Sequence, residues 1–262
     1  NVIIGHYSKK GSAIMRHLFL PDTQVRAGVN TDHIKAAGEY VAEKRPDVIV
    51  MIGDWWDMPS LSTFDKPGCV GWEDKDLDED FESGCDAMND FTAGFRKIRS
   101  YKPKMVFTLG NHENRLKRAR EHPDNRRFRS FLGDDRFRLK ESGWKVVPFL
   151  TPIKINGIVY CHYLTGGLMD RPIGGAIETR LKNVGHSFVT GHQQEYRVGA
   201  IYTNMGKRRR GLVCGSFYAH DEDYVSLQGN KRAWRGLFIL NEVHDGDYDL
   251  CEVSLDYLTT NY

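Results

Sequence analysis

The sequence predicts an α/β protein with two packed sheets, one of them largely parallel. In the first half of the chain, apolar β-branched runs alternate with amphipathic helical segments. In the second half short strand patterns predominate, and no internal repeat or clear linker separates the halves. Because alternating strands and helices are typical of a parallel sheet with helices on its faces, we expect a single domain over residues 1–262, with residues 1–15 as an N-terminal extension.

The first half predicts three strands with two helices between them. Each strand is a short run rich in β-branched and apolar residues, at 17–22 (HLFLPD), 46–54 (PDVIVMIGD) and 104–111 (KMVFTLGN). The first helix spans 32–45, and Thr31 is its expected N-cap. The second helix lies within 84–100, where apolar residues recur at helical spacing. The order βαβαβ predicts a parallel sheet.

The second half is more β-like. Residues 144–163 contain two strand-like runs joined by an Asn-Gly turn at 156–157, a pair that favours a tight hairpin. Further strand patterns follow at 186–192, 209–220, 235–243 and 248–258. Together with the first half they predict two packed sheets, and the last two of them could expose an edge for pairing, so the oligomeric state is open.

The composition is that of an ordinary globular protein, with 40% hydrophobic and 27% charged residues. No apolar stretch reaches the roughly 18 residues that a membrane span needs, so we expect no membrane partner. The five cysteines are an odd number, widely spaced and without a CxxC pair. This pattern favours reduced thiols over a disulfide framework, and we expect a cytoplasmic protein.

Charge is unevenly distributed along the chain. Residues 115–140 contain ten Arg or Lys against four Asp or Glu, a local excess of +6, and we interpret them as an Arg-rich helical insert. A second basic cluster lies at 207–210 (KRRR), whereas residues 73–80 (EDKDLDED) are strongly acidic. Such runs are often only solvated faces. The alternative for the basic runs is a surface that attracts phosphate groups.

Polar side chains follow the predicted strands at the points where the strands end. In chain order these residues are Asp22 and Gln24, Asp54 and Asp57, Asn111, His112 and Glu113, His162, and finally His192 and Gln194. The carboxyl ends of parallel strands share one edge of a sheet, where ligands bind. Each signal alone also fits a turn or a core residue, but five such strand ends in one order predict a common site.

The ordered motifs DTQ, GDWWD, GNHE, CHY and GHQQ resemble those of the calcineurin-like metallophosphoesterases. The resemblance spans roughly residues 17–195, and the continuation is similar to a phage-borne branch in which Gln replaces His in the first and last motifs. It implies a four-layer α-β-β-α sandwich of two mixed sheets flanked by helices, the metallophosphoesterase fold. A phage-encoded chain would act in the host cell cytoplasm.

On the matching positions, the resemblance implies a site for two metal ions. The first ion would be held by Asp22, Gln24, Asp54 and Gln194, and the second by Asn111, His162, His192 and the bridging Asp54. In this family a water or hydroxide between the ions attacks phosphorus in line. His112 would then protonate the leaving oxygen or stabilise charge on it, oriented by Asp57. An imidazole beside a carboxylate has the defined orientation that proton transfer needs.

The two Gln residues, Gln24 and Gln194, depart from the family pattern. An amide oxygen is a harder and weaker ligand than an imidazole nitrogen, and oxygen-only coordination favours Mg²⁺ or Mn²⁺. The His-rich second site suits Mn²⁺ or Zn²⁺. We therefore expect two divalent ions, Mn²⁺ first, with Mg²⁺, Zn²⁺ or Fe as alternatives, and a first site that fills only at higher concentration. His220 could replace a lost ligand, although a surface turn explains it more simply.

Four residues are weaker candidates for contacts with substrate. Trp55 and Trp56 could stack on a base, or could pack in the core. Arg115 and Arg118 lie three apart on one face of a predicted helix and could bind a phosphate, or could be solvated. The glycine-rich segment 164–176 after His162 has the composition of a rim loop.

The sequence thus predicts a metal-dependent phosphodiesterase acting on nucleic acid or a nucleotide, with a nuclease as the leading possibility. The alternative within the enzymes is a phosphomonoesterase such as a phosphoprotein phosphatase, although GDWWDMP lacks the Arg that follows the second Asp there. The alternative outside the enzymes is a non-catalytic nucleic-acid-binding module with a degenerate metal site. His112 and Asp57 disfavour it, because simple binding would not need them.

Overall fold

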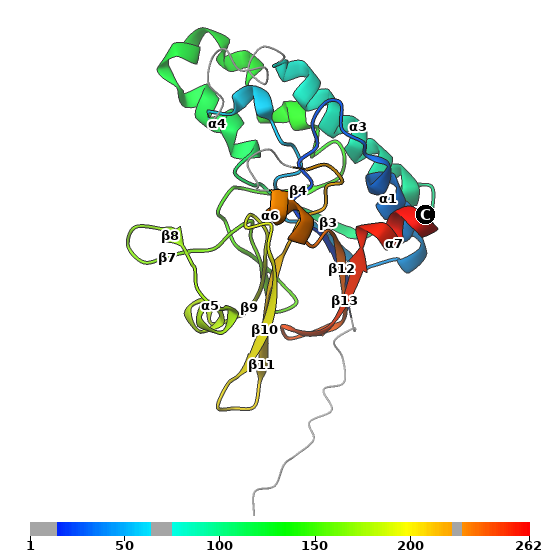
Figure 1. Ribbon diagram of the computed structural model, residues 1–262, viewed down its shortest axis with the longest axis vertical. Helices are drawn as coiled ribbons and strands as arrows, with labels where there is room; N and C mark the ends of the chain where they lie inside the picture. Colours follow the sequence, from blue (N-terminus) through cyan, green and yellow to red (C-terminus); the bar gives the residue numbers. More distant parts are fainter. Residues whose placement is uncertain (1–14, 64–74, 222–226) are drawn as a thin grey trace, which may run out of the picture.

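The computed structural model describes residues 15–63, 75–221 and 227–262 and contains two mixed sheets with helices on their outer faces (Figure 1). Most of the expected N-terminal extension, the start of the acidic run and Cys69 lie outside these residues. The four layers follow the order helices, sheet, sheet, helix, so the predicted α-β-β-α sandwich is confirmed.

The first sheet has six strands. In spatial order they are β13 (Asp247–Ser254), β12 (Gly236–His244), β1 (Met15–Leu20), β2 (Val48–Met51), β3 (Lys104–Thr108) and β4 (Lys145–Val147). The strands β1 to β4 are parallel, whereas β12 and β13 run antiparallel to their neighbours. The three strands predicted in the first half are thus adjacent and parallel, and their carboxyl ends lie at one edge. The strand β12 lies inside the sheet, so only β13 exposes the edge considered for pairing.

The second sheet has five strands. In spatial order they are β10 (Tyr196–Tyr202), β11 (Arg208–Cys214), β9 (Ser187–Thr190), β6 (Ile158–Tyr160) and β5 (Ile153–Ile155). The turn between β5 and β6 has positive φ at both Asn156 (48°) and Gly157 (88°), as a tight hairpin requires. The strand β10 was not predicted from the sequence, although it contains the apolar run VGAIY at 198–202; four of its seven residues are exposed and three are half-buried.

Apolar side chains fill the space between the sheets and beneath the helices. Phe19, Val50 and Val189 belong to the inner layer, where both sheets meet. The outer face of the six-stranded sheet packs against α1 (Asp32–Lys44), α3 (Leu77–Arg96) and α7 (Leu255–Asn261). The helix α5 (Ile177–Val184) covers the five-stranded sheet through Ile177 and Leu181. Because both faces of each parallel region are buried, the sequence of its strands is a continuous apolar run.

Two helix starts differ from the sequence prediction. Thr31 occupies the N-cap position of α1 without a capping bond from its side chain, because the Oδ1 atom of Asn30 accepts from the Asp32 N–H instead. The second helix, α3, begins at Leu77, earlier than expected. The carboxylate of Asp76 accepts from the next turn and so caps it. Part of the acidic run therefore starts a helix rather than forming only a solvated face.

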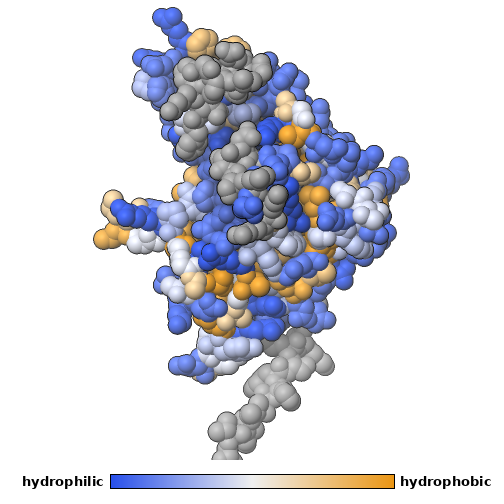
Figure 2. Space-filling view, viewed as in Figure 1, coloured by the Kyte–Doolittle hydropathy of each residue, from blue (hydrophilic) through white to orange (hydrophobic). Residues whose placement is uncertain are grey.

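The remaining elements are short: η1 (Pro59–Leu61), α4 (Glu113–Glu121), η2 (Pro123–Phe131), η3 (Asp134–Phe137), β7 (Thr165–Gly166), β8 (Arg171–Pro172) and α6 (Leu227–Arg232). The Arg-rich segment is helical through α4, η2 and η3. The glycine-rich segment forms the β7–β8 hairpin, whose exposed tip residues Leu168 and Met169 give a hydrophobic end to a projecting arm (Figure 2). No helix in the described ranges is long and apolar enough to cross a membrane.

The helices α1 and α3 approach each other through glycine. A Cβ atom on Gly94 would lie 2.4 Å from the carbonyl carbon of Gly38, and one on Gly38 would lie 2.2 Å from the Phe91 carbonyl oxygen. Both neighbours are backbone atoms, which cannot rotate away. Any larger residue at this crossing would separate the two helices and loosen the outer layer.

We therefore expect Gly94→Ala to lower the free energy of unfolding by about 1–3 kcal/mol through overpacking, although alanine favours a helix by about 1 kcal/mol over glycine. Urea denaturation measures the change. The matched control is Gly174→Ala, where a Cβ meets nothing within 4 Å. Equal stability of the two variants would show that α1 and α3 do not pack through Gly94.

Candidate metal centre

Three candidate ligands lie together at the carboxyl ends of strands from both sheets. Asp54, His162 and His192 each offer a ligand atom, and these atoms all lie within 4.8 Å of one another. Asp54 follows β2 of the first sheet, whereas the two His residues follow β6 and β9 of the second. Three segments far apart in sequence therefore bring one carboxylate and two imidazoles to one place.

Asn111 completes this group through His162. The Nδ1 atom of His162 lies 3.0 Å from the Ile52 carbonyl oxygen, so Nδ1 carries a proton that it donates there. Its Nε2 atom lies 2.9 Å from Asn111 Oδ1 and 3.2 Å from Asp54 Oδ2. With the proton on Nδ1, three lone-pair-bearing atoms face one another. Either a second proton or a metal cation must lie among them, so these residues fit a metal ion.

The residues expected at the first metal lie on the loops that carry Asp54 and His192 or contact them. The main-chain N–H of Gln24 donates to the Asp54 carbonyl oxygen at 2.9 Å. Both carboxylate oxygens of Asp22 lie 3.0 Å from the main-chain nitrogen of His192. Gln194 lies two residues further along that loop, and its Oε1 accepts from the Tyr218 hydroxyl at 2.9 Å.

Four of the candidate ligands have positive φ, which residues other than glycine seldom adopt. The values are 47° for Gln24, 54° for Asp54, 67° for His192 and 52° for Gln194. Each such residue costs of order 1–3 kcal/mol and persists only where the surrounding structure fixes it. Backbone strain of this kind clusters at functional sites, which agrees with the placement of these side chains.

The charged groups of the site depend strongly on one another. Burial opposes ionisation of the Asp54 carboxyl, but His112 and His162 outweigh burial and lower its pKa. Burial lowers the pKa of His162, but Asp54 and its hydrogen bond raise it to about 9. Burial raises the pKa of Asp22 to about 7, and burial together with His162 lowers the pKa of His192 to about 4. The negative charge of Asp54, which favours a proton on His162, also favours a metal cation at the same place.

His112 lies beside this group with its own carboxylate. Its Nδ1 atom lies 2.8 Å from the Asp57 carbonyl oxygen and 3.0 Å from Asp57 Oδ1, and its Nε2 atom lies 3.7 Å from Asp54 Oδ2. Arg26 donates to the other oxygen of Asp57 at 3.1 Å. Burial lowers the pKa of His112, but the two carboxylates outweigh it and raise the value. The predicted pairing of His112 with Asp57 is thus present, and Arg26, which no motif indicates, fixes the carboxylate.

Arg115 and Arg118 have different environments. One Arg115 nitrogen donates to the main-chain oxygens of Asp57 and Met58, at 2.7 and 3.2 Å, and the other lies 3.2 Å from His112 Nε2. Arg115 therefore holds the His112 loop rather than extending toward solvent. Arg118 is exposed on α4. A role for Arg118 in binding substrate stays a prediction.

The predicted role of Trp55 and Trp56 in binding a base is wrong. Both side chains are fully buried, and their indole N–H groups donate to the main-chain oxygens of Gly84 and Phe81 in α3. They pack in the outer core layer, the alternative that the sequence left open, because their strand end faces the covering helix. His220, the candidate replacement ligand, stacks on Tyr218 with ring centroids 4.9 Å apart.

Glu113 is a functional residue that sequence reasoning placed in a motif but gave no role. Its buried carboxylate accepts hydrogen bonds from four main-chain N–H groups, those of Asp54, Trp55, Trp56 and Gly110, at 2.7–3.2 Å. It thereby joins the loop after β2 to the loop after β3. In the sequence, this role is indicated only by a carboxylate in the first helical turn after a Gly-Asn pair. A carboxylate in the first turn is also common at ordinary helix starts.

No protein-family model and no curated protein matches the sequence. Solved structures that align with it include the phosphoesterase YfcE from E. coli and a predicted phosphoesterase from Streptococcus pneumoniae TIGR4. The first is 12% identical, with a TM-score of 0.35 over 92% of this chain and 100% of its own. The second is 11% identical, with a TM-score of 0.34 over 92% and 99%. Similarity this weak supports no conclusion about activity, which has to be inferred from the geometry of the site.

We expect Glu113→Gln to weaken Mn²⁺ binding by about 10–100-fold, as outer-shell substitutions do, and to lower the free energy of unfolding by about 1–3 kcal/mol. The amide would place an N–H₂ group against main-chain donors and separate the two loops. Calorimetric titration and urea denaturation measure the effects. Glu121→Gln, at the exposed end of the same helix, is the control. Wild-type behaviour of Glu113→Gln would show that the loops hold their positions without it.

Proposed function

We propose that this protein is a metal-dependent phosphoesterase of the calcineurin-like type that hydrolyses phosphodiesters in nucleic acid or a nucleotide. The observation that carries the proposal is the convergence of Asp54, His162 and His192 beside the buried pair of His112 and Asp57. A ligand group next to an oriented proton donor is what hydrolysis of a phosphate ester needs. Two divalent ions, when bound, would supply the Lewis acid that polarises the phosphoryl oxygen and acidifies the attacking water.

The ligand sets in this proposal are those that the sequence motifs indicate. Asp22, Gln24, Asp54 and Gln194 form one set, and Asp54, Asn111, His162 and His192 form the other. Asp54 is common to both, and its buried carboxylate offsets the repulsion between two cations. Mn²⁺ is the proposed ion because the sets combine hard oxygen donors with imidazole nitrogen.

His112 is suited to move a proton at the leaving oxygen. Asp54 and Asp57 favour the protonated imidazole, whereas Arg115, whose guanidinium lies 3.2 Å from Nε2, disfavours it. Opposing influences of this kind keep a proton available and yet transferable. Asp57 fixes the ring through Nδ1, so Nε2 is the atom that would face the substrate.

The position after Asp57 favours a diester over a monoester. It holds Met58, which is fully buried, and the nearby guanidinium of Arg115 is bound to main-chain oxygens. A phosphomonoester carries up to two negative charges and benefits from a free guanidinium. A diester carries one negative charge and therefore has less need of a free guanidinium.

The Arg-rich segment supports nucleic acid as the diester. Phe128 and Phe131 in η2 are 59% and 65% exposed and lie three positions apart, so they form one ridge of a 3₁₀ helix. The exposed side chains of Arg126, Arg127 and Arg129 flank this ridge, and the Nε–H of Arg129 donates to the Arg120 carbonyl oxygen at 3.0 Å. Exposed rings among cations are the elements of single-strand binding, where bases stack and phosphates pair with arginine. The helix α4, whose nine residues span about 14 Å, leads from His112 to this surface.

We expect the purified protein with Mn²⁺ to cleave bis(4-nitrophenyl) phosphate and single-stranded DNA faster than 4-nitrophenyl phosphate. Asp54→Asn is expected to reduce kcat/KM by about 100-fold or more, because it removes the charge shared by both ligand sets. Release of nitrophenolate and of labelled oligonucleotide fragments measures the rates. Asp124→Asn, an exposed change in η2, is the control.

Two outcomes would contradict this proposal. Faster cleavage of the monoester with no activity on DNA would indicate a phosphomonoesterase, and turnover unaffected by Asp54→Asn would place the reaction elsewhere. Replacing Arg126 and Arg127 with Glu is expected to raise KM for DNA and leave the aryl diester unchanged. Far-UV circular dichroism of each variant separates loss of function from loss of folding.

We also expect Mn²⁺ to bind in two steps of unequal affinity. The set with His162 and His192 contains two imidazoles, whereas the set with Gln24 and Gln194 contains amide oxygens, which are weaker ligands. Isothermal titration with Mn²⁺ measures both steps, and Gln24→His is expected to tighten the weaker one. Two equally tight sites in the wild-type protein would refute the assignment of the Gln residues to a weaker site.

A further inference from the structure

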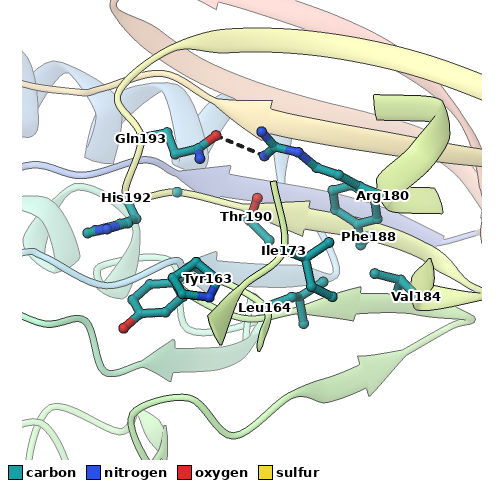
Figure 3. A pocket seen from close by; sticks show the side chains of 11 residues that line it. Tyr163, Leu164, Ile173, Arg180, Val184, Phe188, Thr190, His192 and Gln193 are labelled. Carbon is teal, nitrogen blue, oxygen red and sulfur yellow. Dashed lines mark hydrogen bonds between the residues drawn. The ribbon is translucent and has the colours of Figure 1, made fainter. Parts of the chain in front are cut away.

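A small pocket, about 20 Å³ in volume, is lined in part by His192. Its wall includes Tyr163, Arg180, Thr190 and Gln193, together with apolar side chains from the β7–β8 hairpin and from α5. In Figure 3 the guanidinium group of Arg180 extends from α5 toward Gln193, while Tyr163 and His192 line the other side. Tyr163 and Gln193 directly follow the candidate ligands His162 and His192, so the pocket adjoins the metal centre.

Arg180 is a buried cation, only 7% exposed, whose hydrogen bonds go to neutral groups. Its Nε–H donates to the Gly175 carbonyl oxygen at 2.9 Å, and its Nη1–H donates to Gln193 Oε1 at 2.8 Å. Among the described residues, no carboxylate forms an ion pair with it, and the carboxylate of Glu195 is paired with Arg197 at 2.8 Å. Burial, and then Arg197, lower the pKa of Arg180 and outweigh the carboxylate of Glu195, which raises it.

A buried charge without a partner is costly, and buried charges are normally paired, so an anionic ligand would supply the opposite charge that Arg180 lacks. Gln193 fixes the guanidinium and, because its oxygen accepts from Arg180, its own N–H₂ group is available to donate to the same ligand. The planar guanidinium fork matches the oxygens of phosphate in particular. The chemistry of the pocket is therefore that of a phosphate-class anion.

We propose that Arg180 and Gln193 form a subsite for a second phosphate group of the substrate, adjacent to the phosphodiester that is cleaved. This proposal rests on the proposed function, because it uses the neighbouring metal centre as the place of cleavage. His192 and Gln193 are consecutive residues that point to opposite sides of one loop (Figure 3). The loop therefore sets a fixed spacing between the reacting group and the second phosphate.

The cavity itself is too small to hold a sugar or base. Leu164, Ile173 and Phe188 give it an apolar wall, and its volume of about 20 Å³ has room for about one water molecule. The phosphate would therefore bind at the mouth of the pocket, where Gln193 is exposed. The second phosphate can be a terminal monoester or the next diester along the chain, and both offer the same oxygens.

Binding can be tested without metal or turnover. In EDTA, thymidine 5′-monophosphate is titrated calorimetrically into the wild-type protein and into Arg180→Gln, Arg180→Lys and Lys182→Gln. We expect Arg180→Gln to weaken Kd by about tenfold or more, since hydrogen bonds to charged groups contribute about that factor. Arg180→Lys should retain part of the affinity, and Lys182→Gln, an exposed change on the same helix, should retain all of it. Equal Kd values for all four proteins would overturn the subsite.

Turnover with Mn²⁺ then shows whether the subsite acts on the substrate. The dinucleotide TpT is compared with pTpT, which adds a terminal phosphate, and with TpTpT, which adds a second diester. We expect at least one of the longer substrates to have a KM about tenfold below that of TpT, and Arg180→Gln to abolish this difference. The substrate whose lower KM is lost in Arg180→Gln identifies whether a terminal monoester or a second diester binds the subsite. Cleavage of bis(4-nitrophenyl) phosphate, which has no second phosphate, should not change.

The two proposals fail in different ways. If Arg180→Gln reduces kcat equally for all substrates, including the aryl diester, Arg180 is only structural and the subsite is refuted. If no substrate is cleaved but Arg180→Gln still weakens binding of the nucleotide, the proposed function fails and the anion site stands. Melting temperatures of the variants without ligand show whether any loss of binding reflects loss of folding.

Discussion

The buried carboxylate of Asp54 is the constraint on which the site depends. Its side chain accepts from the His112 main-chain N–H at 2.9 Å and faces the His162 imidazole at 3.2 Å. Its main-chain oxygen accepts from Thr23 and Gln24. One residue therefore joins the loops after β1, β2, β3 and β6. A charge buried this deeply must be compensated, and here His112 and His162 compensate it at the place where a metal ion would bind.

The backbone around this charge is strained in a way that packing alone does not require. Gln24, Asp54, His192 and Gln194 all have left-handed φ, a conformation that a turn would normally give to glycine. The Glu113 carboxylate offsets part of this cost, because it accepts from four main-chain N–H groups that would otherwise be buried without partners. The strained backbone of the candidate ligand loops and the hydrogen bonds of Glu113 that offset its cost therefore belong together. They favour fixed side-chain positions over local stability.

The strands and the candidate ligands were predictable because both have local signals. A buried parallel strand is a short apolar run, and a polar residue directly after it must lie at the carboxyl edge of the sheet. Whether a side chain that follows the strand end is buried cannot be predicted from such a local pattern. Trp55 and Trp56 lie inside the same motif as Asp54 and yet point into the helical layer. The strand β10 was missed although residues 198–202 (VGAIY) are apolar, and because it lies at the edge of the five-stranded sheet most of its residues are exposed and contribute little to the core.

The sequence by itself determined the parallel order of the first three strands, the edge at which the candidate ligands meet and the types of those side chains, since each follows from residues close together in the chain. Only the tertiary structure decided which polar groups face one another. The contacts of Glu113 with Asp54, of Arg26 with Asp57 and of Arg180 with Gln193 form between segments from different elements or different turns. Their partners are set by the packing of two sheets and their helices. The burial of Arg180, from which we infer an anion site, likewise exists only once the chain has folded.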